Sequence, residues 1–369
     1  RSSLVWCRLL GMGGPSRAMV AAKSTPAGTE EVQLPRLTST VGNALQFTSA
    51  LVFASYFWFA PLMALGIVSI SPRGLGLVGW RTCVVIVAAY LAQLVLYKPH
   101  LSHGWSPWLL YSPLSDFAAH YYDSTCVREG PPLDPNGHFL FAVYPHGIYG
   151  VCRLFTGGVK LFGKLFPGIQ MRWGSFSSAF YVPGVREFSL LAGCLDASKP
   201  VLSRAAARGE HIALLPGGID EMMLTDGESK DTKLVMLERK GYAKLAIEQG
   251  MDIVPGFCFG EKWVHKTVHM PPFLQRVLRK FRLSGTLLKG RGPTFLGFLG
   301  VPLGFVWAEP IRVKQQNPVD QAYLDEVHAA VQASVRDVFD RYKARFGYSP
   351  EETLTFVAPK EATKAGKRA

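Results

Sequence analysis

The feature that most constrains this chain is a long stretch without charge near its N-terminus. From Val41 through Ser71 the sequence contains no Asp, Glu, Lys or Arg, and about 20 apolar residues suffice to cross a bilayer. A second uncharged run, Thr82 to Tyr97, follows a connection that contains Arg73 and Arg81. We expect a membrane helical hairpin or re-entrant pair over residues 38–98. A buried core helix is the alternative, and it suits the second run better than the first.

The composition agrees with a membrane-anchored domain. Of the 369 residues, 48% are hydrophobic and 18% are charged, whereas soluble domains average about 25% charged residues. One domain of about 250 residues plus an anchor accounts for this length. We therefore expect a basic, disordered leader over residues 1–37, the hairpin, a main domain over 99–358 and a basic tail over 359–369. The leader's composition also fits a transit peptide.

The first candidate for chemistry is a histidine at the end of a predicted strand. The apolar run Phe139–Val143 predicts a buried strand, and Pro145 should end it because proline cannot donate to a sheet. His146 then lies on the loop beyond, and Gly147 lets other groups pass close by. An imidazole there is suited to proton transfer near neutral pH. The alternative is a packed or loop histidine without a chemical role.

A second predicted strand ends in a similar way. His211–Leu215 is apolar and runs into Pro216, Gly217 and Gly218, which are followed by Ile219, Asp220 and Glu221. Loops at the carboxyl ends of strands are where ligands bind in open α/β sheets. The two loops are therefore expected to meet over one site, although twin glycines also mark simple turns. Strands that alternate with helices around these loops predict an α/β domain.

Several blocks resemble the type-2 diacylglycerol acyltransferase family, which also contains monoacylglycerol and wax-alcohol acyltransferases. Residues 144–147 match one form of its first block, and residues 216–221 match its second. A third block resembles residues 239–244 and continues through 254–261. The similarity covers about residues 40–348 in the expected order. It implies an acyltransferase fold with a mixed sheet and flanking helices, anchored by the N-terminal hairpin.

The resemblance implies an acyl-CoA-dependent O-acyltransferase, with diacylglycerol as the expected acceptor. His146 would be the general base, and Glu221 or Asp220 would orient its imidazole. A thioester is already activated, so we expect no metal or redox cofactor, only acyl-CoA as co-substrate. Related glycerolipid acyltransferases carry an aspartate five positions after the histidine, but this chain has Val151 there. The acid must therefore come from elsewhere in the chain.

Further positions are expected to bind substrate or the oxyanion. Backbone amides near Gly147 or in the glycine turn are candidate oxyanion donors, and Arg239 and Lys244 are candidates for phosphate contacts, with solvated surface charge as the alternative. The full predicted set is Tyr144, Pro145, Gly147, Pro216, Gly217, Gly218, Arg239 and Lys244. The six cysteines lack paired spacing, so neither a disulfide framework nor a zinc site is expected.

The net charge of +13 is concentrated in one segment. Residues 262–291 contain eight Lys or Arg and no acid. Pro272 can begin an amphipathic helix with apolar residues such as Phe273 and Phe281 on one face and Arg279 on the other. Such a helix suits an anionic membrane surface. Coenzyme A phosphates or a solvated face are alternatives, and no nucleic-acid-binding module accompanies the charge.

Two packing helices are predicted without a chemical role. One runs from about Thr232 to Gln249, with Gly250 as its stop before a strand over Met251–Val254. The other begins at Pro318, is capped by Asn317 and ends near Gly347.

Partners and location follow from the expected chemistry. Acyl-CoA, a lipid alcohol and the membrane are the expected partners, and a homo-oligomer is left open. The endoplasmic reticulum membrane with lipid droplets is the expected location, with a plastid as the alternative. Monoacylglycerol or a long-chain alcohol remains open as acceptor, and a non-catalytic lipid-binding membrane protein is the remote alternative.

Overall fold

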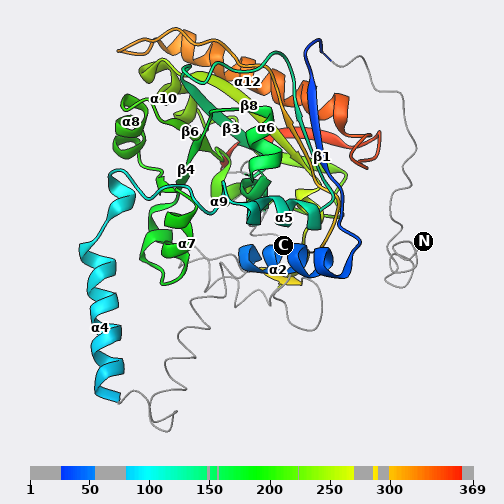
Figure 1. Ribbon diagram of the computed structural model, residues 1–369. Coiled ribbons are helices and arrows are strands. Elements are labelled where there is room, and N and C mark those ends of the chain that lie inside the picture. Colours follow the sequence, from blue (N-terminus) through cyan, green and yellow to red (C-terminus); the bar gives the residue numbers. More distant parts are fainter. Residues whose placement is uncertain are drawn as a thin grey trace.

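A mixed eight-stranded β-sheet organises the protein (Figure 1). The computed structural model describes residues 26–54, 80–147, 150–155, 158–222, 224–269, 286–289 and 299–359. The sheet consists of β1 (Glu30–Leu34), β2 (Ser124–Arg128), β11 (Gly304–Trp307), β8 (Asp252–Phe259), β3 (Phe139–Tyr144), β6 (His211–Leu214), β4 (Met171–Ser175) and β5 (Leu195–Asp196), in that order. The strands from β8 to β5 are parallel, and β11 is antiparallel to β8. This arrangement confirms the predicted α/β class.

Strand β3 lies at the centre and separates two apolar layers. Phe139, Phe141 and Val143 belong to one buried cluster, whereas Leu140 and Ala142 belong to the other. This alternation is the period of two that a strand imposes on its side chains. Because both faces are covered, the strand reads as a continuous apolar run rather than as an alternating one.

Helices cover each face of the sheet (Figure 1). The layer that contains Phe141 also contains side chains of α2 (Thr40–Ala54), α5 (Pro113–Tyr121), α6 (Gly163–Leu165) and α7 (Val185–Leu191). The opposite layer contains α8 (Lys199–Ala207), α10 (Gly241–Gln249) and α12 (Gln321–Tyr342). The remaining elements are η2 (Pro99–Leu101), η3 (Val151–Phe155), η4 (Gly158–Phe162), η5 (Ser177–Tyr181), α9 (Gly218–Met222), η6 (Glu261–Trp263) and the two-stranded sheets β7 (Asp231–Val235) with β12 (Thr353–Val357) and β9 (Lys266–His269) with β10 (Thr286–Lys289).

The predicted helix from Thr232 to Gln249 is wrong over its first half. Residues 231–235 form β7, which pairs in parallel with β12 from the end of the chain. That distant partner outweighs the local helical preference. The helix begins only at Gly241, and Gly250 ends it at φ +65°, as predicted. The following strand, β8, is longer than the predicted Met251–Val254, because it continues to Phe259.

The second predicted helix exists but begins later than expected. Asp320, and not Asn317, is its N-cap, since the Asp320 side chain accepts a hydrogen bond from the amide of Tyr323 at 3.0 Å. The helix therefore starts at Gln321, beyond Pro318. Its buried residues include Val331, in agreement with the predicted packing role.

Part of the expected disordered leader is an ordered strand. Residues Glu30–Leu34 form β1, which pairs antiparallel with β2 at the edge of the sheet. Glu30 also forms an ion pair with Arg128 at 2.7 Å. An uncovered strand edge readily pairs with another segment, and here β1 fills that place. The expected disorder is therefore wrong for this segment.

The first uncharged run begins with a helix that packs against the rest of the domain. Helix α2 lies against α5, with Gln46 and Ala50 buried and the Phe47 ring 6.1 Å from that of Tyr121. Residues 55–79 lie outside the described residues, so the turn of the expected hairpin does too. No helix among the described residues has both the length and the apolar character needed to span a bilayer.

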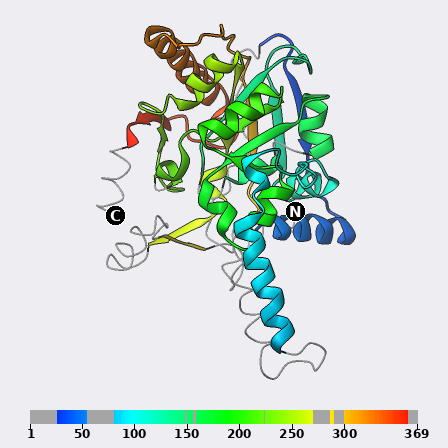
Figure 2. The ribbon, with the colours of Figure 1, turned by 90° about the vertical axis from the view of Figure 1, so that its left-hand side faces the viewer.

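Helix α4 (Trp80–Leu96) extends away from the sheet (Figure 2). Val85 is 65% exposed and Leu96 is 81% exposed, so this run is not the buried core helix considered as an alternative. Its C-terminal end is fixed to α7, because the fully buried Arg186 donates to the Tyr97 carbonyl at 2.8 Å. In addition, Tyr90 donates to Glu187 at 2.7 Å.

Candidate active site

The residues of the candidate site follow the ends of three neighbouring parallel strands. In the order β8-β3-β6, the strands end just before Gly260-Glu261, Pro145-His146 and the glycine turn that leads to Glu221. Carboxyl ends of parallel strands lie at one edge of a sheet, which is where ligands bind in open α/β folds. The structure therefore brings together the two predicted loops and adds a third.

Glu221 holds His146 through the main chain. Its Oε2 accepts a hydrogen bond from the His146 backbone amide at 2.5 Å, and its Oε1 accepts one from the Val235 amide at 3.0 Å. Glu221 lies in α9 and is 1% exposed. The prediction that an acid orients the imidazole is corrected in its geometry, because Glu221 fixes the backbone of the histidine instead of its ring. A carboxylate with two acceptor oxygens can satisfy two amides at once.

The imidazole takes its orientation from a carbonyl. His146 Nδ1 lies 3.0 Å from the Gly147 carbonyl oxygen. Because a carbonyl oxygen only accepts, Nδ1 must carry the proton in this arrangement. Nε2 is then the nitrogen with a free lone pair. This tautomer is the one that a general base acting through Nε2 requires.

Burial keeps His146 neutral. The residue is 8% exposed, and desolvation lowers the pKa of its imidazole to about 4, with a further lowering by the charge of Arg153. A neutral imidazole is the form that can take up a proton. At neutral pH this histidine is therefore present as a base and not as an imidazolium.

A second buried glutamate, Glu261, lies on the other side of the histidine loop. Its Oε1 accepts from the Val151 amide at 2.9 Å, and its Oε2 accepts from the Cys152 amide at 3.0 Å. The side chain is 4% exposed as part of a buried turn. Burial raises the pKa values of both Glu221 and Glu261 to about 7, although the backbone amides that donate to them act in the opposite direction.

Each of these carboxyl groups lies against a glycine. A Cβ at Gly147 would come within 2.5 Å of Glu261 Oε1, and a Cβ at Gly217 would come within 2.4 Å of Glu221 Oε2. Gly147 also has φ +61°, which favours glycine. The oxyanion role of these glycines stays a prediction. The amide of Gly218 donates to the Leu215 carbonyl at 3.1 Å.

The other predicted residues are more dispersed. Asp220 forms an ion pair with Arg239, and the described hydrogen bonds of His146 go to Glu221 and Gly147 instead. Lys244 is exposed on α10. The Tyr144 side chain is fully buried in the core, and its substrate-binding role stays a prediction. Pro145 is buried and Pro216 half-buried beside the two glycine positions.

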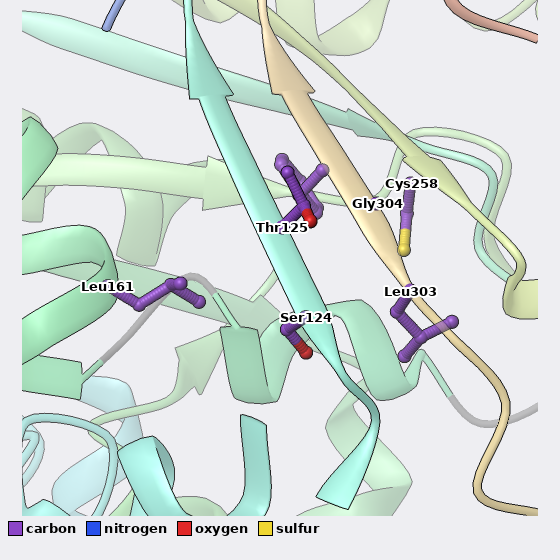
Figure 3. Close-up of a pocket in the computed structure, with 7 residues that line it drawn as sticks. Ser124, Thr125, Leu161, Cys258, Leu303 and Gly304 are labelled. Atoms are coloured by element: carbon purple, nitrogen blue, oxygen red, sulfur yellow. The ribbon is translucent and has the colours of Figure 1, made fainter. Parts of the chain in front are cut away.

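No group of three or more His, Cys, Asp or Glu side chains suited to a metal ion occurs in the described part of the chain. A small pocket lies beside β2 and β11 (Figure 3). Its walls leave no room for even a water-sized sphere, whereas typical ligand pockets enclose roughly 300–1,000 Å³. The residues that line it are Ser124, Thr125, Leu161, Cys258, Leu303, Gly304 and Phe305. We assign it no ligand.

Comparison with known proteins identifies the family of the chain. A family model described as diacylglycerol acyltransferase matches residues 78–357. The protein is thus an acyltransferase enzyme. The chain belongs to the diacylglycerol acyltransferase family, as the motifs predicted.

Individual relatives cover most of the same region. Diacylglycerol O-acyltransferase 2 of Danio rerio is 28% identical over 70% of this chain and 78% of its own length. Acyl-CoA wax alcohol acyltransferase 1 of Homo sapiens is 27% identical over 68% of this chain and 78% of its own length. 2-Acylglycerol O-acyltransferase 1 of Bos taurus is 30% identical over 61% of this chain and 71% of its own length. No solved structure matches the chain.

Sequence reasoning assigned no role to Glu261, although it placed the residue within the third motif block. The available signal was similar to that at the other two loops: an apolar strand, a proline or glycine that ends it, and then an ionisable residue. Gly260 has φ +88° and allows the sharp turn after β8. An acid that follows such a turn at the carboxyl end of a strand is a candidate site residue for the same reason as His146.

Proposed function

We propose that the protein transfers the acyl group of acyl-CoA to the hydroxyl group of diacylglycerol, giving triacylglycerol and coenzyme A. The observation that carries this proposal is the neutral His146, whose Nδ1 bonds to the Gly147 carbonyl and leaves Nε2 as a base. Membership of the diacylglycerol acyltransferase family supports the acyl acceptor.

In the proposed mechanism, His146 is the general base. The hydroxyl oxygen of the acceptor attacks the thioester carbonyl carbon while Nε2 takes the hydroxyl proton. The tetrahedral oxyanion receives hydrogen bonds from backbone amides, for which Gly147 and Gly217 are the candidates. The carbon–sulfur bond then breaks, and the imidazolium returns its proton to the departing thiolate. The thioester is already activated, so we propose that acyl-CoA is the co-substrate and that no metal or redox cofactor takes part.

Glu221 supports this mechanism as a positioning residue. Its bond to the His146 amide fixes the backbone on which the imidazole stands. An enzyme gains rate when reacting groups are held in place before reaction, and misplacement by about 1 Å can reduce the rate by about 10². We therefore propose catalytic roles for His146 directly and for Glu221 through the backbone. Asp220 instead forms a partly exposed ion pair with Arg239.

Two other acceptors have specific support. The relatives named for wax alcohol and for 2-acylglycerol are 27% and 30% identical to this chain, and the diacylglycerol relative is 28% identical. Overall identity therefore does not separate the three. Long-chain alcohols and monoacylglycerol remain second candidates for the acceptor.

We further propose that the uncharged runs form a membrane anchor. The apolar side chains on α4 support this, because Val85, Val95 and Leu96 are 60–81% exposed. Apolar surface of this kind is stabilised when lipid covers it. Arg186 and Glu187 hold the end of α4 against α7, and this connection would place the acyltransferase domain at the membrane surface, close to its lipid substrates.

The proposed location is the endoplasmic reticulum membrane and lipid droplets. Lipid substrates that partition into the bilayer support it, and the basic composition of residues 1–37 supports a plastid as the alternative. Fluorescent fusions with and without residues 1–37 separate the two. Plastid fluorescence that disappears when the leader is removed would contradict the proposed location.

The acceptor is tested by expression in a host that lacks neutral-lipid synthesis, followed by lipid analysis. Triacylglycerol is the expected product. Wax ester alone, or diacylglycerol alone from added monoacylglycerol, would identify one of the second candidates instead. A matched culture that expresses His146→Ala controls for residual host activity. No product from a well-expressed chain would favour the non-catalytic lipid-binding alternative over the proposed reaction.

A further inference from the structure

Buried carboxyl groups accept backbone amides at both ends of the segment from His146 to Cys152, of which residues 146–147 and 150–152 are described. Glu221 accepts the amide of His146 at the near end. Glu261 accepts the amides of Val151 and Cys152 at the far end. The two glutamates come from different strand ends, after β6 and β8, on either side of β3. They therefore hold the segment from opposite sides.

We propose that Glu261 is a second positioning residue for His146, which rests on the proposed role of His146 as general base. Glu261 fixes the far end of the segment and also contacts its near end, because the Gly147 backbone lies against the carboxyl group. Gly147 in turn provides the carbonyl to which His146 Nδ1 donates. The path from Glu261 to the imidazole thus has one intervening residue.

Glu261 is itself fixed by its neighbours. The amide of Gly260 donates to the Tyr348 hydroxyl at 3.1 Å. Lys262 forms an ion pair with Glu352 at 2.5 Å, with both side chains 8% exposed. The residues on each side of Glu261 are therefore bound to the segment that leads into β12. A rigidly held carboxyl group can transmit its position to the groups that it binds.

Replacement of Glu261 by Gln tests the role. Gln offers one acceptor oxygen where Glu offers two, so one of the amides of Val151 and Cys152 would face an NH₂ group. The far end of the segment would then shift away from its present place. We expect the turnover number to fall about 10- to 10²-fold. The KM for acyl-CoA should stay unchanged, because the buried Glu261 side chain is not expected to contact acyl-CoA.

The direct measurement is the rate at which diethyl pyrocarbonate modifies His146, followed by peptide mass spectrometry in the full-length enzyme. In the wild-type protein this reaction should be slow, since His146 is 8% exposed. In Glu261→Gln it should accelerate several-fold. Glu129→Gln is the matched control, because Glu129 is also buried but bonds to Arg341 of α12. The control should leave the modification rate and the turnover number unchanged.

A second variant reaches the same contact from the loop. Gly147→Ala would place a Cβ within 2.5 Å of Glu261 Oε1, and it should also accelerate modification of His146. This variant replaces Glu261→Gln as the test if Glu261→Gln does not fold. An unchanged modification rate in a folded variant of either kind would overturn the proposal. This result can be distinguished from failure of the proposed mechanism. If His146→Ala kept its activity, His146 would not be the base, whatever the modification rates of the other variants.

Discussion

The Oε2 atom of Glu221 accepts a hydrogen bond from the backbone amide of His146 at 2.5 Å. The acid and the histidine of the candidate site therefore meet through the main chain. In a Ser-His-Asp triad the acid bonds to the imidazole itself; here the ring bonds to the Gly147 carbonyl. Glu221 therefore fixes the position of His146 more than it affects the protonation of the imidazole. This difference determines how variants of the two residues should behave.

Glu221→Gln should lower turnover more than Asp220→Asn. Both Glu221 oxygens accept backbone amides, from His146 and Val235, and Gln can satisfy only one of them. Asp220 instead forms a partly exposed ion pair with Arg239, of a kind that contributes little to stability. We expect a loss of about 10² for Glu221→Gln and a change of less than about tenfold for Asp220→Asn. Steady-state kinetics at matched expression measures both, and a larger loss for Asp220→Asn would contradict the assignment.

The protonation of His146 should occur well below the ordinary range for histidine. Its pKa is about 4 in the folded protein, against an ordinary value of 6.5. The pH dependence of its modification by diethyl pyrocarbonate, which requires the neutral ring, should therefore have a midpoint near pH 4. A midpoint near 6.5 in the folded enzyme would show that burial does not act on this group as proposed.

The same shift sets the sign of a stability effect. Between pH 4 and 6.5 the unfolded chain binds more protons at His146 than the folded chain does. Burial of the neutral ring thus contributes stability that is fully present above pH 6.5 and is lost as the pH falls through 4. His146→Ala should therefore lose less stability on acidification than the wild type over this interval, as measured by thermal unfolding in detergent.

Lys262 and Glu352 should each need the other for the stability of the fold. Both side chains are 8% exposed, and Lys262 also donates to the Ser229 carbonyl at 3.0 Å. Removal of one partner leaves a buried charge unpaired, which costs about 3–5 kcal/mol. Lys262→Met should therefore lower the unfolding temperature strongly. Lys262→Met combined with Glu352→Leu should recover much of the loss, and a double variant no more stable than Lys262→Met would contradict this explanation.

The basic segment 262–291 is predicted to bind anionic membranes. Residues 270–285 and 290–298 lie outside the described residues, so the amphipathic helix remains a prediction from sequence. Replacement of Arg276, Arg279 and Lys280 by Gln should weaken vesicle binding of a 262–291 peptide, since each cation near an anionic surface contributes about 1 kcal/mol. In the full enzyme the same changes should leave the KM for acyl-CoA unchanged. Unchanged vesicle binding together with a raised KM would favour coenzyme A phosphates as the target.

The strand ends of the site could be predicted from local sequence, whereas its contacts could not. Proline and glycine after an apolar run mark the ends of β3 and β6, and both loops lie where the pattern placed them. The partner of Glu221 depends on how α9 sits against β3. The contact of Glu261 with Val151 joins residues 110 positions apart. No local pattern specifies such a pair.

The same limit explains the errors in secondary structure. Residues 232–235 have a helical pattern, but they pair with β12, and side chains 122 positions apart, Asp231 and Thr353, bond across this sheet. The start of α12 depends on which side chain reaches a free amide. Asp320 does so and Asn317 does not, although both residue types are good N-caps.

The most direct test of the account is the rate of acyl transfer by His146→Ala in membranes that contain it at the wild-type level. Labelled acyl-CoA and diacylglycerol are supplied together, and labelled triacylglycerol is measured over time. Loss of a general base reduces rates by about 10²–10⁴, so we expect triacylglycerol formation to fall by at least about 10². Formation at the wild-type rate would show that His146 is not the base, and the account of the site would be wrong.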